Sequence, residues 1–397
     1  MGGCRVRLTW IAAAAVTILG IAAAPAGAVS QRPVCPGPAA AGSALCHARV
    51  VTTVNGAPRA TAAPRGYGPA QFRGAYGLPS AAPAGQTIAI VDAYDDPNIA
   101  ADLNAYSSQF GLPLCNSSNP CFQKVNQSGS ASGPFPRTES GWSLEIALDV
   151  EVAHGICPNC KILLVEANSS SLGNLAAAVR TAANLGANEI SNSYGGSEFS
   201  TELSDTYASP YNQPGVAVTV SSGDSGYGSF GFPAALSSVI TVGGTTLTLG
   251  TGNTYGGESV WNGGGSGCSL YMTAPSWQSF LSACAGKRGT ADVAADADPA
   301  TGAAVYDSVK YQGRAGWMQV GGTSLSSPLI AGIYALAGGL PGGSTGASAL
   351  YGHLGDGSLL HDVTSGTNGS CSTLMCKGVA GYDGPTGVGT PRGIGAF

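Results

Sequence analysis

Two carboxylates in an otherwise apolar segment are the residues of this chain whose spacing most strongly suggests chemistry. Glu145 and Asp149 are four residues apart within 142–149, so a helix would place them on one face. Like charges at this spacing repel each other, and an exposed helix would sooner pair Glu with Lys. Two acids that share one proton, or that take a proton from another group, would explain the pair. The alternative is a solvated helix edge, but neighbours such as Ile146 and Leu148 leave little polar surface for one.

A serine at a glycine turn could supply the nucleophile that such acids would activate. Ser324 follows Gly321-Gly322-Thr323 and precedes an apolar helical run, which would put its hydroxyl at a helix N-terminus. The glycines let a substrate backbone approach, and the helix end favours the negative charge that develops during acyl transfer. Serine is also a common N-cap residue, so without partners Ser324 would be interpreted as a cap.

An aspartate in a second glycine turn is the third candidate. Asp224 follows the apolar run 218–220 in the turn Ser221-Ser222-Gly223-Asp224. Turn aspartates are usually structural. Here the turn would follow the end of a buried strand of a parallel sheet, where a side chain can face a cleft, so a functional role is also open.

Short apolar runs separated by helical patterns predict the framework that must position these residues. Runs typical of buried strands are 87–91, 162–165, 216–220 and 239–242, and helical patterns cover 98–110, 143–154, 172–185 and 324–337. This alternation predicts an α/β fold with a mainly parallel sheet covered by helices, whose active site lies at the carboxyl ends of strands. The absence of a repeat, or of a sharp change in composition after Tyr67, favours one catalytic domain over residues 67–397.

The N-terminal residues differ from this framework. Arg5 and Arg7 precede an apolar run over 8–24 and the small residues of 26–28, so we interpret residues 1–28 as a secretory signal rather than a membrane anchor. Residues 29–66 are rich in Pro, Ala and Gly and are interpreted as an extension fastened by one short disulfide loop. We expect the mature protein to be extracellular and free of the membrane once the signal is cleaved.

The cysteines agree with an exported protein. Of the 11 cysteines only Cys4 lies in the expected signal, and the remaining even set falls into local couples. The expected disulfides are Cys35–Cys46, Cys115–Cys121, Cys157–Cys160, Cys268–Cys284 and Cys371–Cys376. The Cys157-Pro-Asn-Cys160 sequence also fits a redox motif or half of a metal site, but no second such pair exists and an oxidising destination favours a plain disulfide.

Composition argues against two classes of partner. With 61 glycines, only 10% charged residues and a formal net charge of −5, the chain is expected to have a loop-rich, sparsely charged surface that suits an acidic medium. The sequence carries no basic patch of the kind that nucleic acid or anionic lipid requires. We therefore expect neither as a partner.

Together, the segments around Glu145, Asp224 and Ser324 resemble the sedolisin family of serine-carboxyl peptidases, and the resemblance extends over residues 67–397. Further similar stretches are 263–268, 275–278 and 291–299. The resemblance implies a doubly wound, subtilisin-like fold and a secreted endopeptidase that acts on proteins or peptides. It implies Ser324 as the nucleophile, Glu145 as the general base, Asp149 as its support and Asp224 as the oxyanion stabiliser.

These roles predict an enzyme that works in acid. The pKa of a glutamate is ordinarily about 4.3, against about 6.5 for a histidine, so a carboxylate base remains ionised at lower pH. Asp224 must be protonated to donate a hydrogen bond to an oxyanion, and low pH or burial must keep it neutral. Activity is therefore expected to fall towards neutral pH.

The same resemblance implies one structural calcium ion and a substrate-binding edge. The calcium ligands would be Asp362, Val363, Val379, Gly381 and Asp383, a set of carboxylates and main-chain oxygens that suits this hard cation. The alternative is two ordinary loop aspartates. The substrate edge would be Ser193, Tyr194 and Gly195, where relatives often carry tryptophan. Relatives are also made with a large folded prosegment, and residues 29–66 are too few to form one.

Two rival functions remain open from the sequence. An ordinary subtilisin would use Asp92 at a strand end and a histidine base, but none of His47, His154, His353 and His361 lies in a His-Gly-Thr-His context. We therefore interpret Asp92 as a supporting acid or simply a strand-end residue. A secreted, calcium-stabilised binding protein that has lost its activity would keep the same scaffold. The intact set of four candidate catalytic residues argues against this second rival. We expect a monomer.

Overall fold

An eight-stranded sheet forms the centre of the protein. The computed structural model describes residues 1–3, 29–228, 230–340 and 342–397. From one edge to the other the strands are β11 (Tyr255–Val260), β10 (Ile240–Leu249), β9 (Ala217–Ser221), β7 (Glu189–Asn192), β4 (Thr87–Ala93), β6 (Lys161–Ala167) and β5 (Phe122–Asn126), and β14 (Val293–Asp296) also pairs with β10. All these pairs are parallel except β10–β11. The prediction of a mainly parallel sheet is confirmed.

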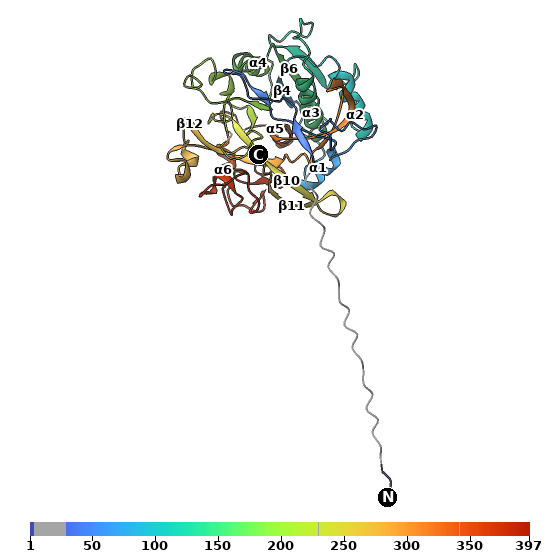
Figure 1. The fold of residues 1–397 in the computed structure, drawn as a ribbon, viewed down its shortest axis with the longest axis vertical. Helices are drawn as coiled ribbons and strands as arrows, with labels where there is room; N and C mark the ends of the chain where they lie inside the picture. The colour runs from blue at the N-terminus through green and yellow to red at the C-terminus, as the bar shows by residue number, and fades with distance from the viewer. Residues whose placement is uncertain (4–28, 229, 341) are drawn as a thin grey trace.

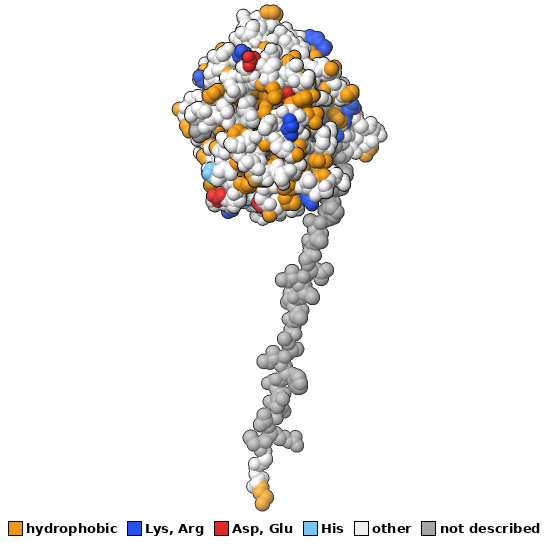
Figure 2. Space-filling model, turned by 90° about the vertical axis from the view of Figure 1, so that its left-hand side faces the viewer, with side chains coloured by type: hydrophobic (Ala, Val, Ile, Leu, Met, Phe, Trp, Pro, Cys, Tyr) orange, Lys and Arg blue, Asp and Glu red, His pale blue; other side chains and the backbone are white. Residues whose placement is uncertain are grey.

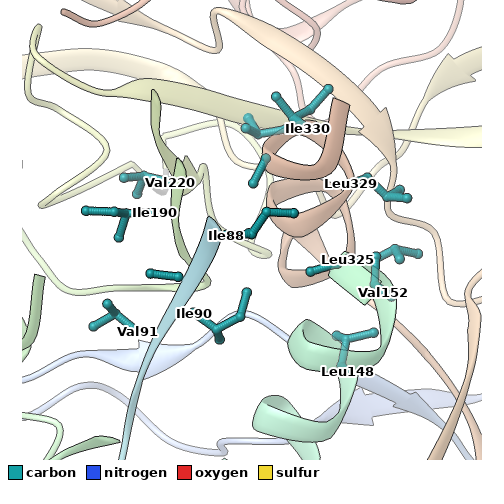
Figure 3. Close-up of a cluster of buried hydrophobic side chains, with 14 of the residues drawn as sticks. Ile88, Ile90, Val91, Leu148, Val152, Ile190, Val220, Leu325, Leu329 and Ile330 are labelled. Carbon is teal, nitrogen blue, oxygen red and sulfur yellow. The ribbon is translucent and has the colours of Figure 1, made fainter. Parts of the chain in front are cut away.

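Helices cover both faces of this sheet, as the sequence predicted. α3 (Ser140–Ile156) and α5 (Thr323–Ala337) pack on one face and against each other, α4 (Leu172–Asn184) packs on the other, and α2 (Ile99–Phe110) lies beside α3 (Figure 1). On β4, Ile88 and Ile90 point towards α3 and α5, whereas Val91 points to the opposite face (Figure 3). These apolar side chains bury both faces of the sheet, which is the condition for a stable parallel sheet.

Helix α3 is buried along almost its whole length. The Glu139 side chain caps its N-terminus by accepting a hydrogen bond of 2.9 Å from Trp142 N. Every residue from Gly141 to Ile156 is buried, because the helix lies between the sheet, α5 and β15 (Ala303–Tyr311). A helix buried on all sides is normally apolar. This one nevertheless carries carboxyl groups at Glu145, Asp149 and Glu151.

The N-terminal extension belongs to a second, antiparallel sheet that the sequence analysis did not predict. Its strand order is β1 (Gln31–Pro33), β3 (Arg49–Val51), β16 (Arg314–Gly321) and β15. β16 leads directly into α5, so the extension is hydrogen-bonded to the strand that precedes Ser324. A further short strand, β2 (Leu45–Cys46), pairs with β8 (Tyr194–Gly195). The extension is thus held by strand pairing as well as by its disulfide.

The five expected cysteine couples are all disulfide-bonded. The expected signal and Cys4 lie outside the described residues, apart from residues 1–3. Among the helices in the described part of the chain, none has the length and apolar character needed to span a membrane. Charged side chains are few and widely separated on the face shown in Figure 2, in agreement with the sparse surface charge expected from the composition.

Candidate active site

The candidate nucleophile, Ser324, lies in the first turn of α5. Gly322 precedes the helix with a φ of 98°, which favours glycine, and a Cβ at this position would collide with the His47 carbonyl oxygen and with Asp224 Oδ2. The turn places the Ser324 N–H at a helix N-terminus, where the first amides have no partner within the helix. The Ser324 side chain is buried, and its Oγ donates a hydrogen bond of 3.2 Å to the Ser193 carbonyl oxygen.

Three carboxyl groups lie together beside this serine, and we call them the catalytic cluster. Glu145 and Asp149 come from one face of α3. Asp92 comes from the end of β4, where the alternation of side chains along a strand puts it on the same side as Ile88 and Ile90. All three are fully buried, and within the described chain none of their oxygens has a hydrogen-bond partner of ordinary geometry. Asp92, expected to be either a supporting acid or a strand-end residue, is near enough to affect the pKa of both other acids.

The acids of the catalytic cluster have raised pKa values. Burial raises the pKa of Glu145 well above its usual range, and the nearby charges of Asp149 and Asp92 raise it further. The Ser324 hydroxyl approaches the Glu145 carboxyl and opposes this rise, although the two side chains form no hydrogen bond of ordinary geometry. Burial likewise raises the pKa of Asp149, and it raises that of Asp92 to about 8. The cluster therefore retains protons well above the pH at which free carboxyls lose them.

Asp224 lies at the N-terminus of α5, next to the serine. Its Oδ1 accepts hydrogen bonds from Thr323 N at 2.8 Å and from Thr323 Oγ1 at 2.9 Å, whereas Oδ2 has no partner within the described residues. Burial raises the pKa of Asp224 to about 7, against the opposing effects of the Thr323 hydrogen bonds and the Arg49 charge. The side chain is therefore protonated in acid, when Oδ2 can donate a hydrogen bond. It caps the helix as well, so the structural interpretation of this turn aspartate also holds.

A cleft of about 510 Å³ is lined by Gly195 of the predicted substrate edge, by Asp224 and by residues 45–49 of the N-terminal extension. Tyr194 of this edge points into the core, where its hydroxyl contacts Asn192 and Tyr211, so it offers a peptide only its backbone. β8 contains Tyr194 and Gly195 and is paired with β2 of the same chain. The edge that was predicted to bind substrate is thus covered by the N-terminal extension.

His47 is a residue of this site that the sequence analysis did not identify. Its Nδ1 lies 2.7 Å from Ser221 Oγ, and its main-chain oxygen accepts a hydrogen bond of 3.3 Å from Ser324 N. Burial lowers the pKa of His47 to about 4, although hydrogen bonding at Ser221 opposes the shift. The signal that could have identified it is its place directly after Cys46, because a disulfide fixes the backbone of an otherwise featureless extension.

The other histidines do not complete a subtilisin-type triad. His154 points away from the catalytic cluster and its Nε2 lies 3.0 Å from the Pro113 carbonyl oxygen, while His361 stacks on Tyr255. Within the described part of the chain, no histidine side chain is hydrogen-bonded to Ser324 or to Asp92. The described residues thus offer Ser324 acids rather than a histidine as its base.

The predicted calcium ligands come together in two adjacent loops. Asp362 Oδ2 accepts a hydrogen bond from Gly381 N at 3.0 Å, and Asp383 Oδ2 accepts one from Val379 N at 3.1 Å. Burial raises the pKa of Asp383 to about 7, and the charge of Asp362 adds to the rise. The main-chain oxygens of Val363, Val379 and Gly381 accept no hydrogen bond within the described chain. Two carboxylates with free carbonyl oxygens are a donor set that fits Ca²⁺.

Comparisons with known proteins relate this chain to serine peptidases. Residues 128–342 match the model of Peptidase_S8, the subtilase family. The chain is 30% identical to sedolisin of Pseudomonas sp. (strain 101), 31% to xanthomonalisin of Xanthomonas sp. (strain T-22) and 31% to kumamolisin of Bacillus sp. (strain MN-32). These matches cover 84%, 85% and 84% of this chain, which spans 60%, 46% and 63% of the respective relatives.

Solved structures agree on the fold. Pseudomonas sedolisin, a serine-carboxyl proteinase complexed with two molecules of pseudo-iodotyrostatin, is 29% identical, with a TM-score of 0.69 over 83% of this chain and 96% of that chain. Sphericase is 18% identical, with a TM-score of 0.52 over 84% of this chain and 99% of its own, which is a likeness of fold alone. The subtilisin-like, doubly wound fold implied by the sequence is confirmed.

Proposed function

Because this chain belongs to the subtilase family and, within it, to the sedolisin group, we propose that it is a serine-carboxyl endopeptidase that cleaves proteins or peptides. One observation carries the proposal: the Ser324 hydroxyl stands at a helix N-terminus beside the buried Glu145–Asp149 pair, with the free carboxyl oxygen of Asp224 at the same helix end. A nucleophile, a base and an oxyanion donor are thus available without a histidine.

In the proposed reaction, Ser324 Oγ attacks the carbonyl carbon of the scissile bond and its proton passes to Glu145. Asp149 supports Glu145 by sharing a proton with it. The oxyanion that forms accepts hydrogen bonds from Ser324 N–H and from protonated Asp224. Glu145 then returns the proton to the leaving amine as the C–N bond breaks, and water hydrolyses the acyl-enzyme by the same steps.

The raised pKa values limit the pH range of this reaction. Asp224 loses its donor proton as the pH rises through about 7, so activity should fall towards neutral pH. Glu145 must be ionised to accept the Ser324 proton, and burial without hydrogen-bond partners opposes that ionisation. Water or substrate that hydrogen-bonds the pair in an open cleft would lower its pKa. These opposing requirements favour an acid enzyme with a bell-shaped pH profile.

We assign one calcium ion a structural role. The carboxylates of Asp362 and Asp383, with the main-chain oxygens of Val363, Val379 and Gly381, would hold it. The ion would neutralise the charge of Asp362 that adds to the raised pKa of Asp383, and it would hold the two loops together. It takes no part in acyl transfer.

Export and assembly belong to the same proposal. Residues 1–28 would direct secretion, and the five disulfides suit an oxidising extracellular medium. The mature protein would act as a monomer on protein substrates. Recovery of the protein from the growth medium, with its mass determined there, tests export and removal of the signal together.

Hydrolysis of a denatured protein, measured from about pH 3 to about pH 8, tests the enzymatic proposal. We expect cleavage by the wild type in acid, none by Ser324→Ala, and a strong reduction in Glu145→Gln. Activity that survives the loss of Glu145 and is greatest at neutral pH would favour a histidine-based subtilisin. No cleavage at any pH by folded, calcium-loaded protein would favour a binding protein without activity.

A further inference from the structure

Residues 44–49 run through the active-site cleft in the manner of a bound peptide. Strand β2 pairs antiparallel with β8, the edge proposed for substrate. Directly after β2, His47 N donates a hydrogen bond of 3.1 Å to the Ser193 carbonyl oxygen, which continues the pairing towards the serine. Main-chain pairing with an exposed sheet edge is a common mode of peptide recognition. The chain's own extension therefore occupies the place of a substrate.

The His47 carbonyl is the part of this segment that meets the catalytic groups. Its oxygen accepts the hydrogen bond from Ser324 N and lies close to Asp224 Oδ2, since a Cβ on Gly322 would collide with both atoms. Ser324 N–H and Asp224 are the two groups that we propose as oxyanion donors. Ser324 Oγ and His47 N both donate to the same Ser193 oxygen, so the hydroxyl lies alongside the segment. The His47–Ala48 peptide bond is thus the one presented to the nucleophile.

The His47 side chain occupies a position bounded by Gly195 and Ser221. Its Nδ1 is 2.7 Å from Ser221 Oγ, and a Cβ on Gly195 would lie 2.8 Å from the ring Cε1. A larger residue at position 195 would thus displace the imidazole. Burial favours the neutral ring, which can still hydrogen-bond the serine hydroxyl. This position therefore suits an uncharged imidazole or a side chain of similar size and polarity.

The segment is anchored on both sides of the His47–Ala48 bond. Before the bond, Cys46 is joined to Cys35 by a disulfide; after it, the chain continues into β3, which pairs with β1 and β16. Such anchors hold the segment in one extended conformation and lower the entropic cost of its binding. Both cysteines precede the bond, so no disulfide among the described residues would tie the segment to the catalytic domain after a cut.

We propose that residues 29–47 are a built-in, substrate-like inhibitor and that the protein cleaves its own His47–Ala48 bond. This inference rests on the proposed function, because Ser324 makes the cut. Ser324 Oγ attacks the His47 carbonyl carbon, the bond to Ala48 N breaks, and Ala48 leaves as an amine with the proton returned by Glu145. Water then releases His47 as a carboxylic acid and restores Ser324. The disulfide-closed fragment, still paired through β1 and β2, blocks the cleft until it dissociates.

Acid should favour dissociation through His47. The cleft lowers the pKa of the imidazole from its ordinary 6.5 to about 4, so the bound form takes up fewer protons between these values and binding weakens as the pH falls. Asp224 acts in the opposite direction, because its buried carboxyl favours the protonated form. Arg49 and Glu198 are the other charged groups that border the cleft. The change His47→Gln keeps a polar group for Ser221 and removes the titration, which isolates the contribution of the imidazole.

Mass spectrometry and N-terminal sequencing of the full chain after incubation in acid test self-cleavage. We expect an N-terminus at Ala48 and a disulfide-closed fragment ending at His47 in the wild type, and an intact bond in Ser324→Ala. A denatured protein substrate in the same samples separates the two proposals. Digestion of that substrate while the His47–Ala48 bond stays intact, or is cut elsewhere, would overturn the self-cleavage and leave the peptidase. If neither the His47–Ala48 bond nor the added protein substrate is cleaved, the proposed peptidase activity itself is overturned.

A synthetic peptide of residues 29–47 with its disulfide closed tests the inhibitor. Added to self-cleaved enzyme, it should inhibit competitively, and a His47→Ala peptide should be at least about tenfold weaker. Relative to the His47→Gln peptide, inhibition by the native peptide should weaken roughly tenfold to a hundredfold between about pH 6.5 and about pH 4. An absence of inhibition by the native peptide at about 1 mM would overturn the inhibitory role.

Discussion

Helix α3 contributes to two groups of buried carboxyls that are alike in burial but differ in their hydrogen bonds. The first is the catalytic cluster. The second, which we call the α2–β15 cluster, combines Asp96, Asp102 and Asp307, whose carboxyl oxygens lie within 4.8 Å of one another, with Glu151 of α3. In both groups the carboxyls are buried, and burial is the largest cause of their raised pKa values.

In the α2–β15 cluster every carboxyl accepts a hydrogen bond from the backbone. The donors are Asn98 N to Asp96, Ser308 N to Asp102, Val309 N to Asp307 and Tyr306 N to Glu151, at 2.7–2.9 Å. Within the described chain, the carboxyls of the catalytic cluster have no such partner. A raised pKa therefore does not by itself identify a catalytic acid. Missing partners beside a reactive hydroxyl do so, because an unsatisfied acid is free to exchange a proton with it.

The strongest test of this comparison is the same substitution at two positions of α3. Glu145→Gln removes the proposed base and should lower kcat by about a thousandfold or more. Glu151→Gln keeps an acceptor for Tyr306 N and should leave kcat within about threefold of the wild type. Steady-state hydrolysis of one peptide at the pH optimum measures both. Equal losses in two variants with unchanged circular dichroism would mean that the two clusters do not differ in function.

Asp224 is like Asp96, Asp307 and Glu151 in having one hydrogen-bonded and one free carboxyl oxygen, but its free oxygen lies at the helix end that carries Ser324. The pKa of Asp224 is raised to about 7, so above that pH the wild type loses its oxyanion donor. Asp224→Asn donates at every pH, and its amide oxygen can still accept from Thr323 N. We expect the ratio of activity at pH 8 to that in acid to rise by about tenfold in this variant. An unchanged descending limb of the pH profile would assign that limb to another group.

Asp307→Asn tests the structural side of the comparison. The pKa of Asp307 is raised from 3.8 to about 8 in the folded protein, so the protonated carboxyl favours the folded state. This stabilisation of the folded state is fully present below about pH 4 and is lost as the pH rises towards 8. Asparagine keeps an acceptor for Val309 N and does not ionise. The variant should therefore unfold in urea with about 1–2 kcal/mol more stability than the wild type at pH 7, and with equal stability at pH 4. If the variant is less stable than the wild type at both pH 4 and pH 7, the α2–β15 cluster needs the carboxyl group of Asp307.

The smallest expected effect concerns the Asp362–Asp383 loops, where carboxyls accept backbone N–H groups but free carbonyl oxygens are also present. Removal of calcium by a chelator should lower Tm by about 5 °C, because the ion stabilises only the folded loops. Asp362→Asn should have the lower Tm without chelator and should not respond to it. A wild-type Tm that does not change on chelation would contradict the calcium assignment.

Local patterns in the sequence predicted the main elements closely. The expected helices 98–110 and 172–185 correspond to α2 and α4, and the four expected strands all lie in the central sheet. Helix α3 is longer than the predicted 143–154, because Glu139 caps it upstream of the apolar pattern. The strands of the N-terminal extension were missed, since segments of two or three residues show no periodicity.

The sequence by itself determined the alternation of strands and helices, the cysteine couples and the residue types of Glu145, Asp149 and Ser324, because each depends on short spacings along the chain. Only the tertiary structure decided that Asp92 joins the acids, that Asp224 shares the helix end with Ser324, and that His47 fills the cleft. These outcomes depend on which distant segments pack together and which buried groups are left without partners. No local pattern encodes them, because long-range contacts become favourable only when the whole core has formed.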